Sequence, residues 1–189
     1  MKNVQIVGKR GGGLERDFDF YKNAFLDISK SNVKNVVILN FGNDFFPSLK
    51  LKNCQVERII NNQKIVPISI GRHARLLKAC IRSCIASKTI ESIHILSVFP
   101  RLLSKCTDEC KKCITYDLDQ VLKISDSLKN TFSTEKKVVI HDIQKIYDQG
   151  TKKESILAFY EQLVCQDRVH LNFSGKNVVA NYLTTVLGQ

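Results

Sequence analysis

The sequence predicts an α/β fold, a three-layer sandwich around a mainly parallel sheet of about five strands. Short, continuous, β-branched apolar runs recur along the chain, as expected of strands that are covered on both faces. Segments with the 3.6-residue period of amphipathic helices lie between these runs. The predicted strands are Val4–Val7, Val36–Leu39, Ile65–Ile70, Ile93–Val98 and Val138–Ile140.

Five segments have the apolar spacing of amphipathic helices. Their apolar positions are Phe18, Tyr21, Phe25 and Ile28; Leu77, Cys80, Ile81 and Cys84; Leu118, Val121, Leu122 and Leu128; Ile156, Leu157, Tyr160, Leu163 and Val164; and Val178, Val179, Tyr182, Leu183 and Val186. Pro67 cannot donate a ladder hydrogen bond, so it favours an irregular or edge position for the third strand. The polar stretches Lys105–Lys112 and Lys129–Lys137 are predicted loops.

The composition predicts one globular domain over residues 1–189. A hydrophobic content of 43% with ordinary charge density excludes a disordered chain. The strand predicted at Val4 leaves no room for a signal peptide, and no apolar run approaches the roughly 18 residues of a membrane span. Seven cysteines without a secretion signal predict reduced thiols in a cytosolic or nuclear protein, and we expect a cytoplasmic one.

The charge balance is strongly basic. Lys and Arg number 29 against 18 Asp and Glu, a net charge of +11. Such a surplus favours a polyanionic partner, because cationic side chains displace the counterions condensed on phosphates. The alternative is that the charge only keeps the protein soluble.

Polar segments follow several predicted strands. The carboxyl ends of parallel strands form the ligand-binding edge of an open α/β sheet. The segments expected at this rim are Gly8–Gly13, Gly42–Asp44, Gly71–His73 and Pro100–Arg101, with the loop at Asp167–His170 able to join them.

The turn Asp167-Arg168-Val169-His170, with Leu171-Asn172 and Gly175 following, resembles the late Asp-x-x-His motif of the SGNH/GDSL hydrolase family. The segment Ile95–Arg101 also resembles the fourth-strand region of small members. The resemblance implies an α/β esterase fold with a Ser in a Gly-Asp-Ser turn after the first strand, and a Gly and an Asn in the oxyanion hole. It implies that Asp167 and His170 correspond to the family's catalytic pair.

The chain departs from that family at the nucleophile. Arg10 aligns with the catalytic Ser and Lys9 with the preceding acid. A guanidinium has no free nucleophilic lone pair, so Arg10 cannot accept an acyl group. Gly42-Asn43-Asp44 resembles the family's Gly-x-Asn-Asp; either Asn43 is the oxyanion residue, or Arg72 or His73 replaces it. We therefore expect a pseudoenzyme in which Asp167 and His170 are vestigial.

Basic residues cluster on one predicted helix face and at the rim. Arg72, Arg75, Lys78 and Arg82 lie opposite the apolar positions of the second helix, and Lys9, Arg10, Arg101 and Arg168 fall at the rim. Guanidinium groups match phosphate oxygens in pairs. Within the broader family, missing chemistry combined with basic charge is similar to the OSK domain of the insect germ-plasm protein Oskar, which is SGNH-like, lacks the active site and binds RNA.

The sequence thus predicts an RNA-binding domain, with other proteins of a ribonucleoprotein assembly as further partners. A divergent esterase that uses Asp167 and His170 with another nucleophile, or a protein-interaction module, are the alternatives. Gly11-Gly12-Gly13 lacks the spacing of a nucleotide-binding loop. Cys106, Cys110 and Cys113 have a spacing seen in iron–sulfur enzymes, but we expect neither a cluster nor zinc there, and no cofactor elsewhere.

Overall fold

The computed structural model describes residues 7, 13–39, 58–60, 63–65, 68–99, 118–147, 160–165 and 170–188. Within these residues, three parallel strands form one sheet in the order β1–β4–β5. They are β1 (Asn35–Leu39), β4 (Ser92–Leu96) and β5 (Val138–His141). The α/β class is confirmed, and the described part of the chain supplies three parallel strands where the sequence predicts about five.

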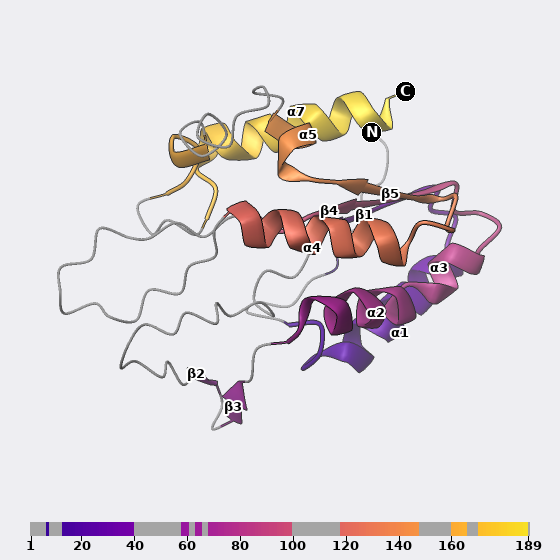
Figure 1. Ribbon diagram of the computed structural model, residues 1–189. Helices are drawn as coiled ribbons and strands as arrows, with labels where there is room; N and C mark the ends of the chain where they lie inside the picture. Colours follow the sequence, from indigo (N-terminus) through magenta and orange to yellow (C-terminus); the bar gives the residue numbers. More distant parts are fainter. Residues whose placement is uncertain are drawn as a thin grey trace.

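Helices cover both faces of this sheet (Figure 1). On one face lie α1 (Phe18–Ser29), α2 (Ile70–Cys80), α3 (Arg82–Ala86) and α4 (Leu118–Thr131), and on the other α5 (Ile143–Tyr147) and α7 (Phe173–Leu187). Four of the five predicted helices correspond to α1, α2–α3, α4 and α7. Of the remaining one, Tyr160 and Glu161 are helical, and the chain has left the helix by Val164.

The predicted strand Ile65–Ile70 is wrong over its described second half. A separate antiparallel pair, β2 (Arg58–Ile60) and β3 (Gln63–Ile65), ends at Ile65, and Ile70 is already the first residue of α2. The hydroxyl of Ser69 accepts a hydrogen bond from the Arg72 backbone N–H at 3.3 Å and so caps the helix. This cap overrides the β propensity of the neighbouring isoleucines. The segment Gly71–His73 therefore lies inside α2 and not at the end of a strand.

Two other sequence predictions need comment. The predicted loop Lys129–Lys137 begins inside α4, which continues to Thr131. The predicted strand Val4–Val7 lies outside the described residues except for Val7, which is exposed and has no regular secondary structure. The predicted loop Lys105–Lys112 also lies outside them.

The two faces of the sheet differ in chemistry. Alternation along the strands puts a set of β-branched side chains on the face toward α1–α4, and all of them are buried: Val36, Ile38, Ile93, Ile95 and Ile140. The other face carries His94 and His141, which lie beneath α7. The apolar face supplies much of the core, while the second face buries polar groups that need partners.

A short turn fixes the start of α7. Asn172 accepts a hydrogen bond from the Gly175 backbone N–H at 2.9 Å, and its side-chain amide donates to the Gln162 carbonyl at 2.8 Å. Gly175 is buried, and a Cβ built there would overlap the Leu163 carbonyl oxygen. The cap and the close approach explain the Asn172–Gly175 spacing without a catalytic role. No helix in the described ranges is long and apolar enough to cross a membrane.

Candidate functional site

The helices α2 and α3 present a basic face to solvent. Leu77, Cys80, Ile81 and Cys84 are each at most 1% exposed, so the opposite side of this helical stretch points outward. That side carries Arg72, Arg75, Lys78 and Arg82, as the helical spacing predicts. The packing of one face against the core thus fixes where the cations project.

The four cations are not equivalent. Arg72 forms an ion pair with Glu15, and Lys78 lies 2.7 Å from Glu135. Arg75 and Arg82 are exposed and form no ion pair within the described ranges. These two guanidinium groups are therefore available to an anion without first breaking a contact to a carboxylate.

Lys78 holds α2 against the end of α4. Its ammonium donates to the Thr131 carbonyl at 3.1 Å and lies 5.8 Å from the centre of the Phe132 ring. A carbonyl at a helix C-terminus, a carboxylate and an aromatic face all favour a cation at this position. Lys78 thus links α2 to the C-terminal end of α4.

A groove of about 550 Å³ lies along this basic face. Its lining residues come from α2, α3 and the turn after α4: Arg75, Lys78, Ala79, Arg82, Ile85, Ala86 and Glu135. Arg75 and Arg82 are two helical turns apart, which places their backbones roughly 10 Å from one another along the axis. The lining therefore combines cations with three apolar side chains, Ala79, Ile85 and Ala86, which we call the floor.

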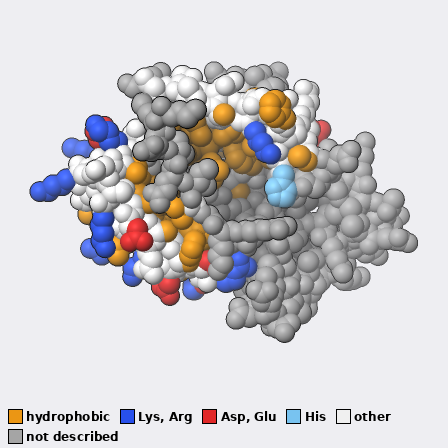
Figure 2. All heavy atoms as spheres, turned by 180° about the vertical axis from the view of Figure 1, so that it is seen from behind, with side chains coloured by type: hydrophobic (Ala, Val, Ile, Leu, Met, Phe, Trp, Pro, Cys, Tyr) orange, Lys and Arg blue, Asp and Glu red, His pale blue; other side chains and the backbone are white. Residues whose placement is uncertain are grey.

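On the face seen from behind, basic side chains are unevenly distributed. Seen from behind, apolar side chains gather across the middle of the described surface, while most Lys and Arg side chains lie toward its margin (Figure 2). The exposed apolar residues of the molecule include Val37 and Leu39 of β1. Three cations, Arg75, Lys78 and Arg82, line the groove along α2 and α3.

Most of the predicted rim residues lie outside the part of the chain that the structure describes. Lys9, Arg10, Arg101, Arg168 and Asp167 lie outside the described residues, as do Asn43 and Cys106, Cys110 and Cys113. His170 is described: it is exposed, and its carbonyl accepts a hydrogen bond from the Cys165 backbone N–H at 2.7 Å. The structure brings Arg75, Lys78 and Arg82 together at one groove, and the rim pocket remains a prediction.

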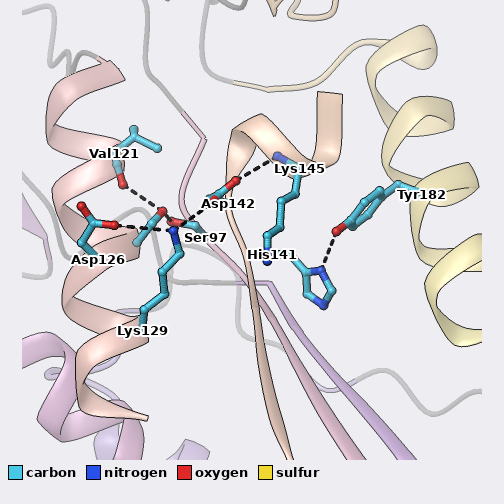
Figure 3. Close-up of polar contacts among 9 residues, drawn as sticks. Ser97, Val121, Asp126, Lys129, His141, Asp142, Lys145 and Tyr182 are labelled. Atoms are coloured by element: carbon cyan, nitrogen blue, oxygen red, sulfur yellow. Dashed lines mark hydrogen bonds and ion pairs between the residues drawn. The ribbon is translucent and has the colours of Figure 1, made fainter. Parts of the chain in front are cut away.

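A buried row of polar side chains crosses the second face of the sheet, and the sequence reasoning missed it. His94 Nδ1 lies 3.0 Å from His141 Nε2. His141 Nδ1 in turn lies 2.6 Å from the Tyr182 hydroxyl of α7 (Figure 3). On the other side, His94 Nε2 lies 2.9 Å from Ser92 Oγ, which donates to Asn35 Oδ1 at 2.7 Å. Both imidazoles are almost fully buried.

The direction of donation along this row fixes both tautomers. Because Ser92 donates to Asn35, its oxygen accepts from His94 Nε2–H, which leaves His94 Nδ1 as an acceptor. His141 then donates through Nε2–H and accepts the Tyr182 O–H at Nδ1. Two neutral imidazoles satisfy every contact, and burial lowers the pKa of His94 below its ordinary value. Burial, followed by the neighbouring His94 and Lys145, lowers the pKa of His141 to about 4, against an opposing effect of Asp142.

Polar groups also meet where β4 and β5 end (Figure 3). Asp142 accepts from the Lys145 backbone N–H at 2.9 Å and pairs with Lys129 at 2.9 Å. Burial raises the pKa of Asp142, but the Lys129 and Lys145 hydrogen bonds outweigh it, so the pKa lies below its ordinary value. Ser97 is buried and accepts the Ser125 O–H at 2.6 Å. These contacts join α4, the sheet and α5, and we assign them a structural role.

Within the described ranges, no three His, Cys, Asp or Glu side chains lie close enough together to hold a metal ion. Burial above all raises the pKa of the Cys80 thiol to about 12 and that of Cys84 to about 11, so both are unreactive packing residues.

Comparisons with known proteins establish a likeness of fold. No protein-family model matches the chain, and no curated protein matches it either. A solved structure described as a "putative platelet activating factor" from Streptococcus pneumonia is similar, with a TM-score of 0.51 and 13% sequence identity. The match covers 92% of this chain and 94% of the streptococcal one. At that identity the likeness concerns the fold alone.

Proposed function

We propose that the chain is a non-catalytic SGNH-hydrolase-like domain, similar to OSK domains, that binds RNA at the α2–α3 groove. The observation that carries the proposal is the pair of exposed guanidinium groups, Arg75 and Arg82, beside a groove and without ion pairs in the described ranges. The net charge of +11 supports a polyanionic ligand. The streptococcal likeness supports the scaffold and is silent on the ligand.

The proposal gives the basic residues different roles. Arg75 and Arg82 contact phosphates in pairs of hydrogen bonds, and Lys78 adds a fixed positive charge. Arg72, held by Glu15, lies at the end of the same face. The rim residues Lys9, Arg10, Arg101 and Arg168, which lie outside the described residues, are proposed as further RNA contacts. Because phosphate contacts dominate, affinity depends steeply on salt and only modestly on sequence. We place the domain in the cytoplasm, where RNA partners and reduced thiols coexist.

The proposal is tested by reversing the two free charges. Arg75→Glu/Arg82→Glu is expected to weaken RNA binding by about tenfold or more, and to lower the salt slope of log affinity by about 2, since each lost phosphate contact removes about one unit. Filter binding over a salt titration measures both quantities. Neither side chain is part of the core, so the circular dichroism spectrum and the melting temperature stay those of the parent.

A matched control keeps the net charge equal. Lys30→Glu/Lys176→Glu makes the same change at two exposed positions, the C-cap of α1 and a residue within α7. Under the proposal this variant retains most of the affinity. Equal affinity of the groove variant and the parent at every salt concentration would show that the basic face is only a solvated helix surface.

We also expect no hydrolysis of simple acyl esters. Arg10 cannot serve as the nucleophile, and Ser97, at the end of β4, is buried and already accepts the Ser125 hydroxyl. Incubation with a fluorophosphonate probe should leave the protein unlabelled. Stoichiometric labelling of the parent that disappears in His170→Ala would identify a divergent esterase instead.

A further inference from the structure

The basic groove is also lined by one acidic residue, Glu135. Glu135 lies in the turn after α4, where its backbone N–H donates to the Phe132 carbonyl at 2.9 Å and its own carbonyl accepts from Val138 at 2.9 Å. Its Oε1 atom is held 2.7 Å from the Lys78 ammonium. Its backbone and its side chain are thus both fixed, and the side chain remains partly exposed to the groove.

Glu135 does not suit a groove that binds phosphates alone. A fixed carboxylate repels phosphates. Lys78 pairs with only one of its two oxygens, Oε1. Within the described ranges, Oε2 has no donor partner. An oxygen with this geometry accepts hydrogen bonds from N–H groups, and the N–H groups of a nucleic acid lie on its base edges.

The floor of the groove also favours a base. Ala79, Ile85 and Ala86 are apolar, and Arg75 and Arg82 in the same lining carry planar guanidinium groups. Bases stack on such groups. A duplex keeps its bases stacked inside and offers phosphates and sugars to such a groove. A single strand can turn a base onto the floor while its phosphates reach the two arginines.

We propose that the groove binds single-stranded RNA with a base on the Ala79–Ile85–Ala86 floor, and that Glu135 selects a base with an exocyclic amino group. This inference rests on the proposed RNA-binding function. Cytosine and uracil have the same ring size, but cytosine presents an amino donor where uracil presents a carbonyl. The carboxylate attracts the first and repels the second, so cytosine is bound in preference to uracil.

The test compares two single strands of about ten nucleotides, one of cytidines and one of uridines, at a fixed salt concentration and neutral pH. The parent is expected to bind the cytidine strand about tenfold more tightly. In Glu135→Gln the amide offers both a donor and an acceptor, so the ratio falls toward one, mainly through a gain for the uridine strand. A duplex of the same length is expected to bind more weakly than the cytidine strand.

A second variant separates base selection from the anchoring of Lys78. Lys78→Met removes the same ion pair but leaves the carboxylate, on a backbone that the hydrogen bonds to Phe132 and Val138 still hold. Under the proposal it weakens both strands, and the ratio stays above one. Equal affinities for both strands in the parent would overturn base selection by Glu135, as would a Glu135→Gln variant that keeps the parent's ratio. The Arg75→Glu/Arg82→Glu variant would still weaken both strands in that case, which leaves RNA binding itself intact. If neither strand binds the parent at low salt, both proposals fail together.

Discussion

Gly175→Ala is expected to lower the free energy of unfolding by about 3 kcal/mol, the upper end of the cost of overpacking a tight site. The new methyl group would overlap the Leu163 carbonyl oxygen and crowd the Leu163 and Leu171 side chains. The nearest of these atoms belongs to the backbone and cannot rotate away. Relief therefore requires a shift of α7 away from the chain that precedes it, and this shift strains the Asn172 cap.

Gly71 provides the matched control. A Cβ at Gly71 would meet only the end of the flexible Arg75 side chain, at 3.4 Å. Gly71→Ala in α2 is expected to stabilise the protein by about 0.5–1 kcal/mol, because alanine is the better helix former. Urea denaturation followed by circular dichroism measures both changes. If the two variants have the same stability, the close approach of α7 to Leu163 is not a tight contact.

Stability is expected to fall by about 3 kcal/mol as the pH is lowered from about 6.5 to about 4. Burial holds the pKa of His141 at about 4, below the ordinary 6.5 of the unfolded chain. Between these two pKa values the unfolded state binds a proton at His141 and the folded state does not. The contribution of neutral His141 to the free energy of unfolding is therefore complete above pH 6.5 and is lost as the pH falls toward 4. His94, whose pKa is also lowered, acts in the same direction. Asp142, also with a lowered pKa, adds a separate loss at still lower pH.

The His141→Gln variant isolates this effect. Its amide can still hydrogen-bond to neighbouring groups but takes up no proton, so the fall in the urea midpoint between pH 7 and pH 4.5 should be much smaller than in the parent. Neutral imidazoles in the parent would also give the two-dimensional NMR signature of Nε2–H tautomers at pH 6. An equally steep fall in both proteins would place the acid sensitivity elsewhere in the chain.

Local patterns predicted the helices well. The apolar face of α2 and α3 depends only on the spacing of Leu77, Cys80, Ile81 and Cys84, and that spacing also fixes where Arg75 and Arg82 project. The strand prediction failed at Ile70 because Ser69 is a helix cap, a signal that the β-branched run obscured.

Contacts between distant segments could not be predicted in this way. His94 and His141 lie on neighbouring strands, and only the sheet register brings their rings together. Each histidine in its own strand looks like an isolated polar residue. Likewise, Glu135 lies in a polar turn, and only the packing of α2 against α4 makes it a wall of the groove. Register and helix packing are long-range properties, and local spacing does not encode them.

The Lys78–Glu135 contact has a consequence for the cost of binding. It ties α2 to the turn after α4, and the additional bond to Thr131 and the Phe132 ring prevent the lysine from swinging out. Both sides of the groove are therefore held in place before a ligand arrives. Association generally loses free energy to the ordering of side chains and loops. Under the proposed RNA binding, the protein's share of this cost therefore falls mainly on the Arg75 and Arg82 side chains.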